Sequence, residues 1–393
     1  MDKLPTRDEL LHHFYEHWHP HLGTEVIPIA KAVGRICAKS YQSINQIPVV
    51  RSSAFDGIAV KSADFQDGIP DTSKWVINQD FCRADTGDDF ADTFDTVIKI
   101  ESVTFLPEGG VKLDLPKDLL PGEGVRRSGS FMTKNDALVK KGDILTPLSL
   151  TSLLSGGYTT VEVKIRPRVI FLPTGSELVK PGTPLTRGKN IETNGSLVKM
   201  IMSEWGADVT CLPICYDDHD SLKDELFAVL DSADILILNG GSSKGEEDFT
   251  VHLLEEESSF FIHGVRCVPG RPAVFCLIQN KPVINLPGPP AAALAVLSWG
   301  IKDLYYHAME SDVPHTRLEV TLTDAVSGAG PFDFFQRLFI YEKDGKLYAK
   351  PFSMKDKTAE VNQYCNGYTI VSSGSAYDKG NQITAESLFP SVL

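Results

Sequence analysis

The sequence feature that most constrains the fold is a short apolar run that leads into two adjacent glycines. Residues 235–238 read Ile-Leu-Ile-Leu, and Gly240 and Gly241 follow after one asparagine. The run is too short for a helix and too evenly apolar for a half-exposed strand, so it predicts a buried central strand of a parallel sheet. Because the carboxyl ends of such strands face a ligand crevice, the turn after this run is the first candidate for a functional site.

This turn carries groups suited to an oxyanion. Gly240 and Gly241 let the backbone approach a bound group closely, while Ser242, Ser243 and the amides before the next helix can donate hydrogen bonds. Phosphate or a similar anion fits such a set of donors.

Acidic residues in the same turn indicate a cation as well. Glu246, Glu247 and Asp248 would repel an anion unless a divalent cation lay between carboxylate and phosphate, which is a usual arrangement for magnesium. The turn therefore predicts an anion and a metal together. An equally open alternative is that Asp248 caps the helix that begins near Phe249, with the two glutamates solvated beside the helix dipole.

Composition bounds the class of protein. A chain of 393 residues, 42% hydrophobic and 23% charged, predicts a globular protein of roughly two to four domains. The net charge of −14 argues against broad nucleic-acid binding, which needs a basic surface. The seven cysteines form no CxxC pair and are odd in number, which fits a reduced compartment. The N-terminus has no apolar core of a signal peptide, and the apolar stretch 291–299 is too short to span a bilayer. We therefore expect a cytoplasmic protein with no membrane or nucleic-acid partner.

The order of patterns along the chain predicts a multidomain α/β plus β protein. From residue 168, strand and helix patterns alternate at the spacing of βαβ units on a parallel sheet. Before that point, short β-like runs indicate a β-rich domain, and a second helical stretch is expected over 29–33. The expected boundaries are 1–41 with 132–166 for a discontinuous N-terminal linker domain, 42–131 for the β-rich domain, 167–309 for the α/β domain and 310–393 for a C-terminal β domain.

Loops that follow different strands of a parallel sheet lie at one edge, so distant segments can share a site. Besides the glycine turn, the candidates are residues 173–177 with Thr174 and Glu177, the pair Asp217 and Asp218, and the proline–glycine turns 268–272 and 286–290. In the first of these two turns, the Arg271 guanidinium is a planar group that can bind an oxyanion through two hydrogen bonds. The alternatives are that Glu177 and Asp217 are surface charges, that the proline turns are only turns, and that Arg271 pairs with a nearby carboxylate.

Two further candidates lie in the β-rich region. Asp56 is expected on an exposed loop, and Thr86 on another. The pattern alone favours the alternative that each is an ordinary turn acid or hydroxyl. Several common catalytic motifs are missing from the sequence: GxxxxGK[ST], HExxH and a dinucleotide fingerprint in a strand-to-helix setting. ATPase and dehydrogenase functions therefore lose support.

Taken in order, these segments resemble those of the molybdopterin molybdenumtransferase family, the MoeA-type enzymes related to the E domain of gephyrin. The resemblance covers essentially the whole chain. The segments that carry it are 53–60 (SAFDGIAV), Thr86-Gly87, 125–127 (VRR), 173–178 (PTGSEL), Thr193-Asn194, Asp217-Asp218, 240–248, 269–272 (PGRP) and 286–288 (LPG).

The resemblance implies a fold and a reaction. The fold would be an elongated protomer with a three-layer α/β molybdopterin-binding domain on a parallel-rich sheet, a β-rich lid domain, a linker layer and a C-terminal β domain. Two such protomers would form a homodimer, with each site where the α/β domain meets the β domain of the other subunit. Adenylylated molybdopterin and molybdate would react, with Mg²⁺ or a similar divalent cation, to give molybdenum cofactor and AMP. Other cofactor-biosynthesis proteins and recipient apoenzymes are the further partners implied.

The resemblance also implies roles for single residues. Asp248 would be the acid that positions metal and substrate, with Asp217 or Asp218 as a further metal ligand, and Glu177 would be a cleft carboxylate. Asp56 and Thr86 would reach in from the partner's β domain. The residues expected to bind substrate or anion are Thr174, Asn194, Gly240, Gly241, Ser242, Ser243, Pro269, Gly270, Arg271, Pro287 and Gly288.

This sequence departs from the family pattern near the proposed site. The usual Lys-Pro-Gly-Lys-Pro has Val268 and Arg271 at the two lysine positions, and the usual Gly-Glu-Asp has Ser130 and Phe131 in place of the two acids. An Asn that usually follows Leu-Pro-Gly is Pro289, so an amide and its hydrogen bonds are lost. These changes leave a second hypothesis open, a non-catalytic carrier or scaffold that binds molybdopterin or a nucleotide on the same fold.

Overall fold

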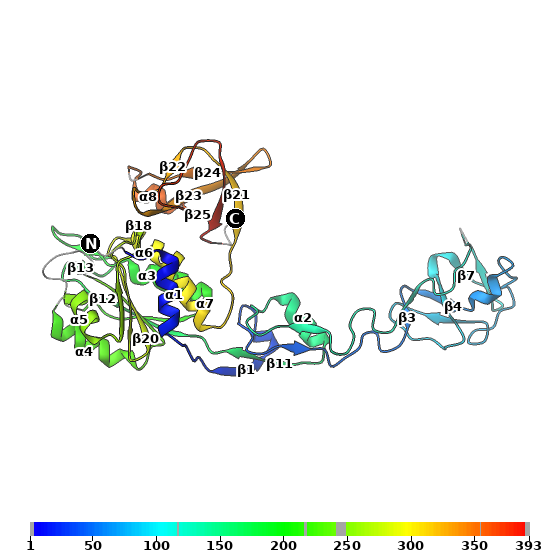
Figure 1. Cartoon of the computed structure of the whole chain (residues 1–393). Helices are drawn as coiled ribbons and strands as arrows, with labels where there is room; N and C mark the ends of the chain where they lie inside the picture. Colours follow the sequence, from blue (N-terminus) through cyan, green and yellow to red (C-terminus); the bar gives the residue numbers. More distant parts are fainter. Residues whose placement is uncertain (1–3, 116–117, 216–217, 241–248, 354, 390–393) are drawn as a thin grey trace. The chain divides into compact units, whose positions relative to one another are not determined.

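The computed structural model of the chain describes residues 4–115, 118–215, 218–240, 249–353 and 355–389. It divides into two compact units (Figure 1). The larger unit is formed by residues 1–25 and 164–393, and the smaller unit by residues 26–163. Among the described residues, no helix has both the length and the apolar character needed to cross a membrane.

The larger unit is built around a six-stranded sheet. Four neighbouring strands run parallel, and the last two are antiparallel to their neighbours. The apolar run 235–238 forms the first four residues of β16, which pairs in parallel with a strand on each side, so the predicted central parallel strand is confirmed. In spatial order the strands are β15 (Asp208–Cys211), β12 (Arg168–Pro173), β16 (Ile235–Asn239), β20 (Lys281–Leu286), β19 (Val274–Ile278) and β17 (Phe260–His263).

Helices cover both faces of this sheet and make a three-layer domain (Figure 1). On one face, apolar residues of α4 and α5 pack against alternate strand residues such as Leu236 and Leu238. The residues between them, such as Ile235 and Ile237, are also buried and face the opposite layer. The helices are α1 (Arg7–His17), α3 (Asn194–Trp205), α4 (His219–Leu230), α5 (Phe249–Glu257), α6 (Pro290–Val296) and α7 (Lys302–Ala308), with a π-helical segment, η4 (Leu297–Ile301), between the last two.

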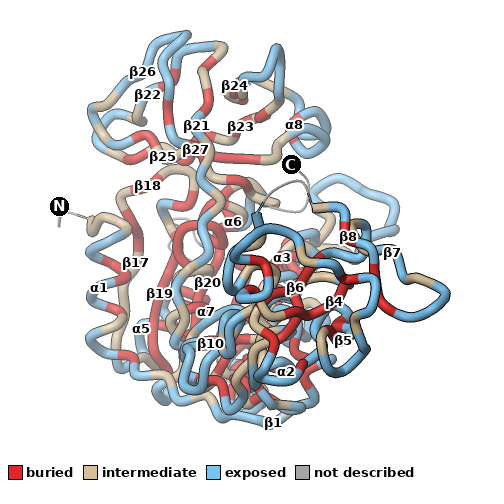
Figure 2. The backbone as a smooth tube through the Cα atoms, turned by 90° about the vertical axis from the view of Figure 1, so that its right-hand side faces the viewer, coloured by how far each residue is buried: buried red, intermediate tan, exposed pale blue. Residues whose placement is uncertain are grey.

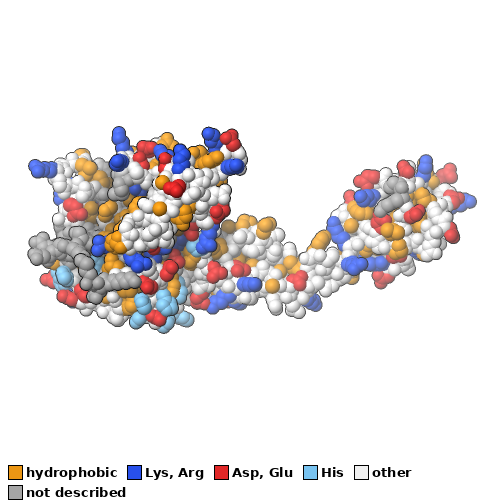
Figure 3. All heavy atoms as spheres, turned by 45° about the horizontal axis from the view of Figure 1, so that its top comes forward, with side chains coloured by type: hydrophobic (Ala, Val, Ile, Leu, Met, Phe, Trp, Pro, Cys, Tyr) orange, Lys and Arg blue, Asp and Glu red, His pale blue; other side chains and the backbone are white. Residues whose placement is uncertain are grey.

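Burial follows this layering. Figure 2 shows β19 and β20 buried, whereas the outer side of α1 is exposed. Aromatic packing connects the layers, since the Phe275 ring of β19 lies 6.4 Å from that of Phe14 in α1 and 5.8 Å from that of Trp299 in η4. On the face seen in Figure 3, acidic and basic side chains are interspersed over both units.

The C-terminal part of the larger unit is a β-barrel-like domain. Its strands follow the order β18-β23-β24-β21-β27-β25, and β23 also pairs with β25, which closes the sheet on itself. Its core is formed by alternate residues such as Val320, Leu338 and Ala349. The strands are β18 (Cys267–Val268), β21 (Arg317–Leu322), β23 (Asp333–Lys343), β24 (Lys346–Pro351), β25 (Gly367–Val371) and β27 (Gln382–Ser387), with a small pair β22 (Val326–Ser327) and β26 (Ala376–Tyr377) and the helix α8 (Thr358–Tyr364).

In its described residues, the smaller unit consists of short paired strands, 3₁₀ turns and one α-helix. Its three-stranded sheet has β4 (Gly57–Val60) between β5 (Phe81–Ala84) and β6 (Thr96–Lys99). The helix α2 (Pro147–Ser155) begins with a capping box between Thr146 and Ser149. The remaining pairs are β3 (Ser52–Ser53) with β9 (Val125–Arg126), β7 (Val103–Phe105) with β8 (Val111–Leu113), β2 (Tyr41–Gln42) with β10 (Ala137–Val139), and β1 (Thr24–Pro28) with β11 (Thr160–Lys164).

The structure corrects the helix expected over 29–33. Only residues Ile29–Lys31 form a single 3₁₀ turn, and Gly34 donates its N–H to the carbonyl oxygen of Leu145. Residues just before the turn are extended in β1 and pair with β11, so tertiary pairing overrides the local helix pattern. The multidomain α/β plus β fold itself is confirmed.

Candidate active site

A buried polar junction ties four segments together at the carboxyl edge of the central sheet. Asn194, in the first turn of α3, donates through Nδ2 to Asn239 Oδ1 at 2.7 Å and to the Gly288 carbonyl oxygen at 2.9 Å. Thr174 follows β12, and its N–H donates to the Asn239 carbonyl oxygen at 3.0 Å. The structure thus brings together the predicted residues Thr174, Asn194 and Gly288, which are distant in sequence.

Gly240 completes this junction for a steric reason. Its carbonyl oxygen accepts from Asn285 Nδ2 at 2.8 Å, and its N–H donates to Asn285 Oδ1 at 3.3 Å. A Cβ atom at this position would lie 1.7 Å from Thr174 Oγ1, so any other residue would force Thr174 or the backbone to move. The backbone is therefore held in place immediately before the predicted glycine–serine turn.

Sequence reasoning missed Asn239 and Asn285, although both are buried and central to the junction. The sequence did contain a signal for them, since each is an amide residue at or near the end of an otherwise apolar strand. A buried amide is costly without hydrogen-bond partners, so such a residue indicates a polar contact at the strand end. One acceptor stays open, because Asn194 Oδ1 is buried without a hydrogen-bond partner among the described residues. We name the set Thr174, Asn194, Asn239, Asn285 and the Gly240 and Gly288 backbones the amide junction.

Part of the predicted site lies outside the described residues. This applies to Asp217, Gly241, Ser242, Ser243, Glu246, Glu247 and Asp248. The part of the chain that the structure describes contains no group of three or more His, Cys, Asp or Glu side chains able to hold a metal ion. The predicted metal site therefore depends on acids known here from sequence alone.

Asp218, which was predicted as a metal ligand, has a structural role in the described chain. It is the N-cap of α4, and its Oδ1 accepts the Ser221 N–H at 2.9 Å. Hydrogen bonds from the side chain and backbone of Ser221 lower the pKa of the Asp218 carboxyl below its usual value. The cap stabilises the helix and keeps this acid ionised.

Glu177 lies on the loop after β12, close to Gly175. Its carboxylate oxygens are 2.8 and 2.9 Å from the place that a Cβ atom of Gly175 would take, and Gly175 has a φ of +147°. Lys189 binds the same loop, since its Nζ donates to the Ser176 carbonyl oxygen at 2.7 Å. The loop that carries Thr174 therefore has a carboxylate, Glu177, and a cation, Lys189, beside it. Both of these residues are exposed.

The turn with Pro269, Gly270 and Arg271 lies at the same sheet edge. It precedes Val274, the first residue of β19, which pairs with Asn285 of β20. The Arg271 guanidinium lies over the Phe332 ring, 5.0 Å from its centroid, and no carboxylate in the described chain is within ion-pair distance. Of the residues in the other proline turn, Pro287 is buried and Gly288 is exposed, with open space where a Cβ atom would be.

The smaller unit contains its own predicted pair. Asp56 Oδ1 accepts hydrogen bonds from the N–H and the Oγ1 of Thr86, both at 2.7 Å. These bonds lower the pKa of the Asp56 carboxyl below its usual value, so the acid is ionised at neutral pH. The next residue, Gly57, has no room for a side chain, because a Cβ atom would lie 2.0 Å from the Ile98 carbonyl oxygen.

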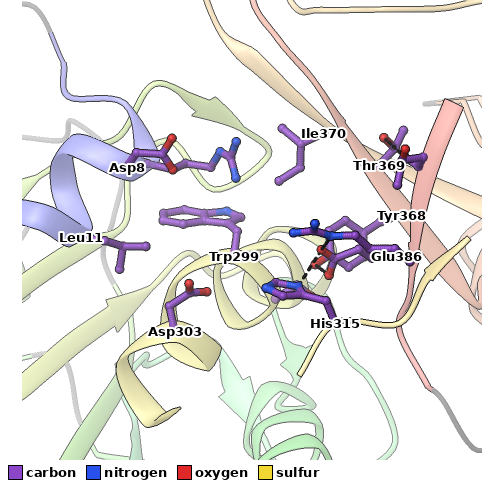
Figure 4. Close-up of a pocket in the computed structure, with 13 residues that line it drawn as sticks. Asp8, Leu11, Trp299, Asp303, His315, Tyr368, Thr369, Ile370 and Glu386 are labelled. Atoms are coloured by element: carbon purple, nitrogen blue, oxygen red, sulfur yellow. Dashed lines mark hydrogen bonds and ion pairs between the residues drawn. The ribbon is translucent and has the colours of Figure 1, made fainter. Parts of the chain in front are cut away.

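A separate cavity of about 320 Å³ lies in the larger unit, and none of the predicted site residues lines it (Figure 4). Trp299 and Asp303 line it from the helical side. On the strand side, Glu386 accepts from the Tyr368 hydroxyl at 2.8 Å, and its Oε1 lies 2.8 Å from His315 Nδ1. Burial raises the pKa of the Asp303 carboxyl to about 6.

Two known families match different parts of the chain. Residues 6–157 match the family described as MoeA N-terminal region (domain I and II). Residues 170–306 match the family described as probable molybdopterin binding domain. The second match covers the amide junction and the turn after it.

Comparison with individual proteins gives relatives over most of the chain. The molybdopterin molybdenumtransferase of Haemophilus influenzae is 32% identical over 284 residues, which are 69% of this chain and 69% of the relative. That of Bacillus subtilis is 25% identical over 382 residues, which are 92% of this chain and 89% of the relative. The solved molybdopterin biosynthesis MoeA protein of Pyrococcus horikoshii has the same fold, with a TM-score of 0.80 and 23% identity over 98% of this chain and all of that one. This chain belongs to the molybdopterin molybdenumtransferase family, a family of transferases in molybdenum cofactor biosynthesis.

Proposed function

We propose that the protein inserts molybdenum from molybdate into adenylylated molybdopterin and releases AMP, with Mg²⁺ or a similar divalent cation. The observation that carries this proposal is the amide junction, a buried polar edge that ends at Gly240, directly before the glycine, serine and carboxylate residues of the turn. The relatives named molybdopterin molybdenumtransferase support the choice of substrate.

The roles we assign follow the chemistry of the side chains. Thr174, Asn194 and the glycine backbones would bind the pterin and its phosphate through hydrogen bonds, and Arg271 would pair with molybdate or phosphate oxygens. Asp248 and Asp217 would hold the divalent cation, which neutralises phosphate charge when bound. Opening a phosphoanhydride mainly requires charge neutralisation and alignment, so no nucleophilic side chain is needed.

We propose that the active form is a cytoplasmic homodimer, in which Asp56 and Thr86 of one copy complete the site of the other. Exposed apolar side chains on the smaller unit favour a second copy as a partner. Val49 is 76% exposed and Leu148 is 81% exposed, and burying such groups stabilises association. Sedimentation velocity of the purified protein tests this directly: a single species at the monomer mass contradicts it.

The second candidate function is a carrier or scaffold that binds the pterin without catalysis. The observation in its favour is the set of departures from the family pattern, with Val268 where a lysine is usual and Phe131 where an acid is usual. Loss of a cation near the oxyanion would weaken charge stabilisation without preventing binding.

One experiment separates the two functions. The purified protein is incubated with adenylylated molybdopterin, Mg²⁺ and molybdate, and AMP release is measured together with molybdenum bound to pterin. Both products, dependent on molybdate and lost in Asp248→Asn, are expected. Glu255→Gln, on the exposed side of α5, is the matched control and should keep full activity. Tight pterin binding by the wild type without AMP release would instead establish the carrier.

A further inference from the structure

Phe131 presents an open aromatic face on the smaller unit. The residue is 64% exposed, although its backbone N–H is fixed by a 3.0 Å hydrogen bond to the Ile47 carbonyl oxygen. The Arg126 guanidinium lies over the ring, with Cζ 5.0 Å from the centroid. A large aromatic ring that is held in place and left open to solvent is suited to stacking on a flat ligand.

Arg126 is itself positioned by the strand that carries it. It pairs with Ser52 across β9 and β3, and its Nη2 donates to the Ala54 carbonyl oxygen at 3.1 Å. That bond uses one of the five N–H groups of the guanidinium. The remaining planar edge suits a phosphate group, which it can bind through two parallel hydrogen bonds.

Asp56 lies two residues beyond Ala54 and offers a free acceptor. Its Oδ1 takes both hydrogen bonds from Thr86, while within the described chain no donor reaches Oδ2. An ionised carboxylate with a free oxygen binds hydroxyl groups well, as carboxylates bind the ribose of dinucleotides. Phe131 contacts Arg126, and Arg126 binds the Ala54 carbonyl oxygen, two residues before Asp56. The ring, the guanidinium and the carboxylate therefore lie on linked segments of the smaller unit.

We infer that Phe131, Arg126 and Asp56 form a nucleotide platform. The base stacks on the open face of Phe131, the phosphate pairs with Arg126, and a ribose hydroxyl donates to Asp56 Oδ2. The inference rests on the proposed function, since the nucleotide would be the AMP portion of adenylylated molybdopterin. It also gives a physical use for Phe131, because an acid at that position would repel the phosphate that Arg126 attracts.

The test measures binding of AMP and of adenosine by calorimetry, with the full-length protein. Phe131→Leu removes the ring and should weaken both ligands about 5- to 150-fold, the equivalent of one base–aromatic stack. Phe131→Tyr keeps the ring and should bind like the wild type. Arg126→Gln should weaken AMP about tenfold and leave adenosine unchanged, which separates the phosphate contact from the stack.

The matched control is Phe105→Leu. Phe105 is 37% exposed, and the Arg83 guanidinium lies 4.6 Å from its centroid, so it repeats the same pair elsewhere in the smaller unit. This variant should keep wild-type affinity for both ligands. If Phe131→Leu binds AMP as the wild type does, or changes only the oligomeric mass, the platform is refuted and Phe131 is an apolar contact between copies.

The two proposals fail in distinguishable ways. If Phe131→Leu loses AMP affinity but the wild type forms no molybdenum-bound pterin, the platform stands and the transferase proposal fails. If the wild type inserts molybdenum while Phe131→Leu keeps its AMP affinity, the transferase proposal stands and the platform is refuted. Wild-type protein that binds no AMP at millimolar concentration would also refute the platform.

Discussion

Asn194 and Asn239 share a buried side-chain hydrogen bond of 2.7 Å that ties the first turn of α3 to the carboxyl end of β16. The same Asn194 amide binds the Gly288 carbonyl oxygen, so one side chain joins a helix, a strand end and a proline turn. These hydrogen bonds hold the three segments in a fixed arrangement, because the buried groups that they pair would be costly to leave unpaired. Among the described residues, Asn194 Oδ1 is the acceptor of this network that stays open. The bound pterin would therefore meet a preformed edge.

Asn194→Ala should destabilise the fold and weaken pterin binding. The substitution leaves Asn239 Oδ1 and the Gly288 carbonyl oxygen without their donor, so a loss of about 2–4 kcal/mol in the free energy of unfolding is expected. Urea denaturation checks the stability, and calorimetry with the pterin checks the affinity. Thr193→Ala, at the neighbouring exposed N-cap that makes no side-chain cap bond, should change the stability by less than about 0.5 kcal/mol. Equal effects of the two variants would contradict the role of the junction.

Gly240→Ala should be among the most disruptive single substitutions in the α/β domain. The new methyl group would lie 1.7 Å from Thr174 Oγ1, so strand ends or side chains must shift, at a cost of about 3 kcal/mol. Adding Thr174→Ala removes that oxygen and should recover part of the loss. Gly288→Ala is the control, because open space surrounds its Cβ position. Thermal unfolding of the four proteins is the measurement, and an unaffected Gly240→Ala would exclude the steric argument.

Asp303→Asn should raise the stability of the protein at neutral pH. The folded-state pKa of about 6 lies above the ordinary 3.8, so the folded state binds this proton more tightly than the unfolded state. The contribution is fully present below about pH 4 and is lost as the pH rises through about 6. The substitution should therefore add roughly 1–3 kcal/mol above about pH 7 and have little effect below about pH 4. A stability difference that is independent of pH would show that the Asp303 carboxyl is not the cause.

Thr86→Ala should raise the pKa of the Asp56 carboxyl. The Thr86 N–H and hydroxyl both stabilise the ionised form, and the substitution removes the hydroxyl. Because the folded-state pKa is lowered, the stabilising contribution of Asp56 is present above its unfolded pKa and is lost as the pH falls through the folded value. Carboxyl NMR titration of the wild type and the variant measures this. The similar pair of Asp136 with Thr133 is an internal control and should not move.

Much of the architecture could be predicted because it depends on local patterns. The alternation from residue 168 correctly predicted β12, α3, β15, α4 and β16 on a parallel sheet, since apolar periodicity reports which residues must be buried. The prediction of a helix over 29–33 was wrong, because the pairing of β1 with β11 decided the conformation there. Closure of the C-terminal sheet by the β23–β25 pairing joins segments far apart in sequence, so no local pattern indicates it.

The sequence by itself determined the family, the order of secondary structure and the residue types at the candidate site, because these depend on composition, periodicity and motif order. Only the tertiary structure decided what several of those residues do. Asp218 caps a helix, and Arg271 stacks on Phe332. Asn239 and Asn285 form hydrogen bonds of the amide junction, which no sequence motif predicted. The physical reason is that hydrogen bonds and ring contacts act over a few ångströms between segments, and only the packing of helices on the sheet brings those segments within reach.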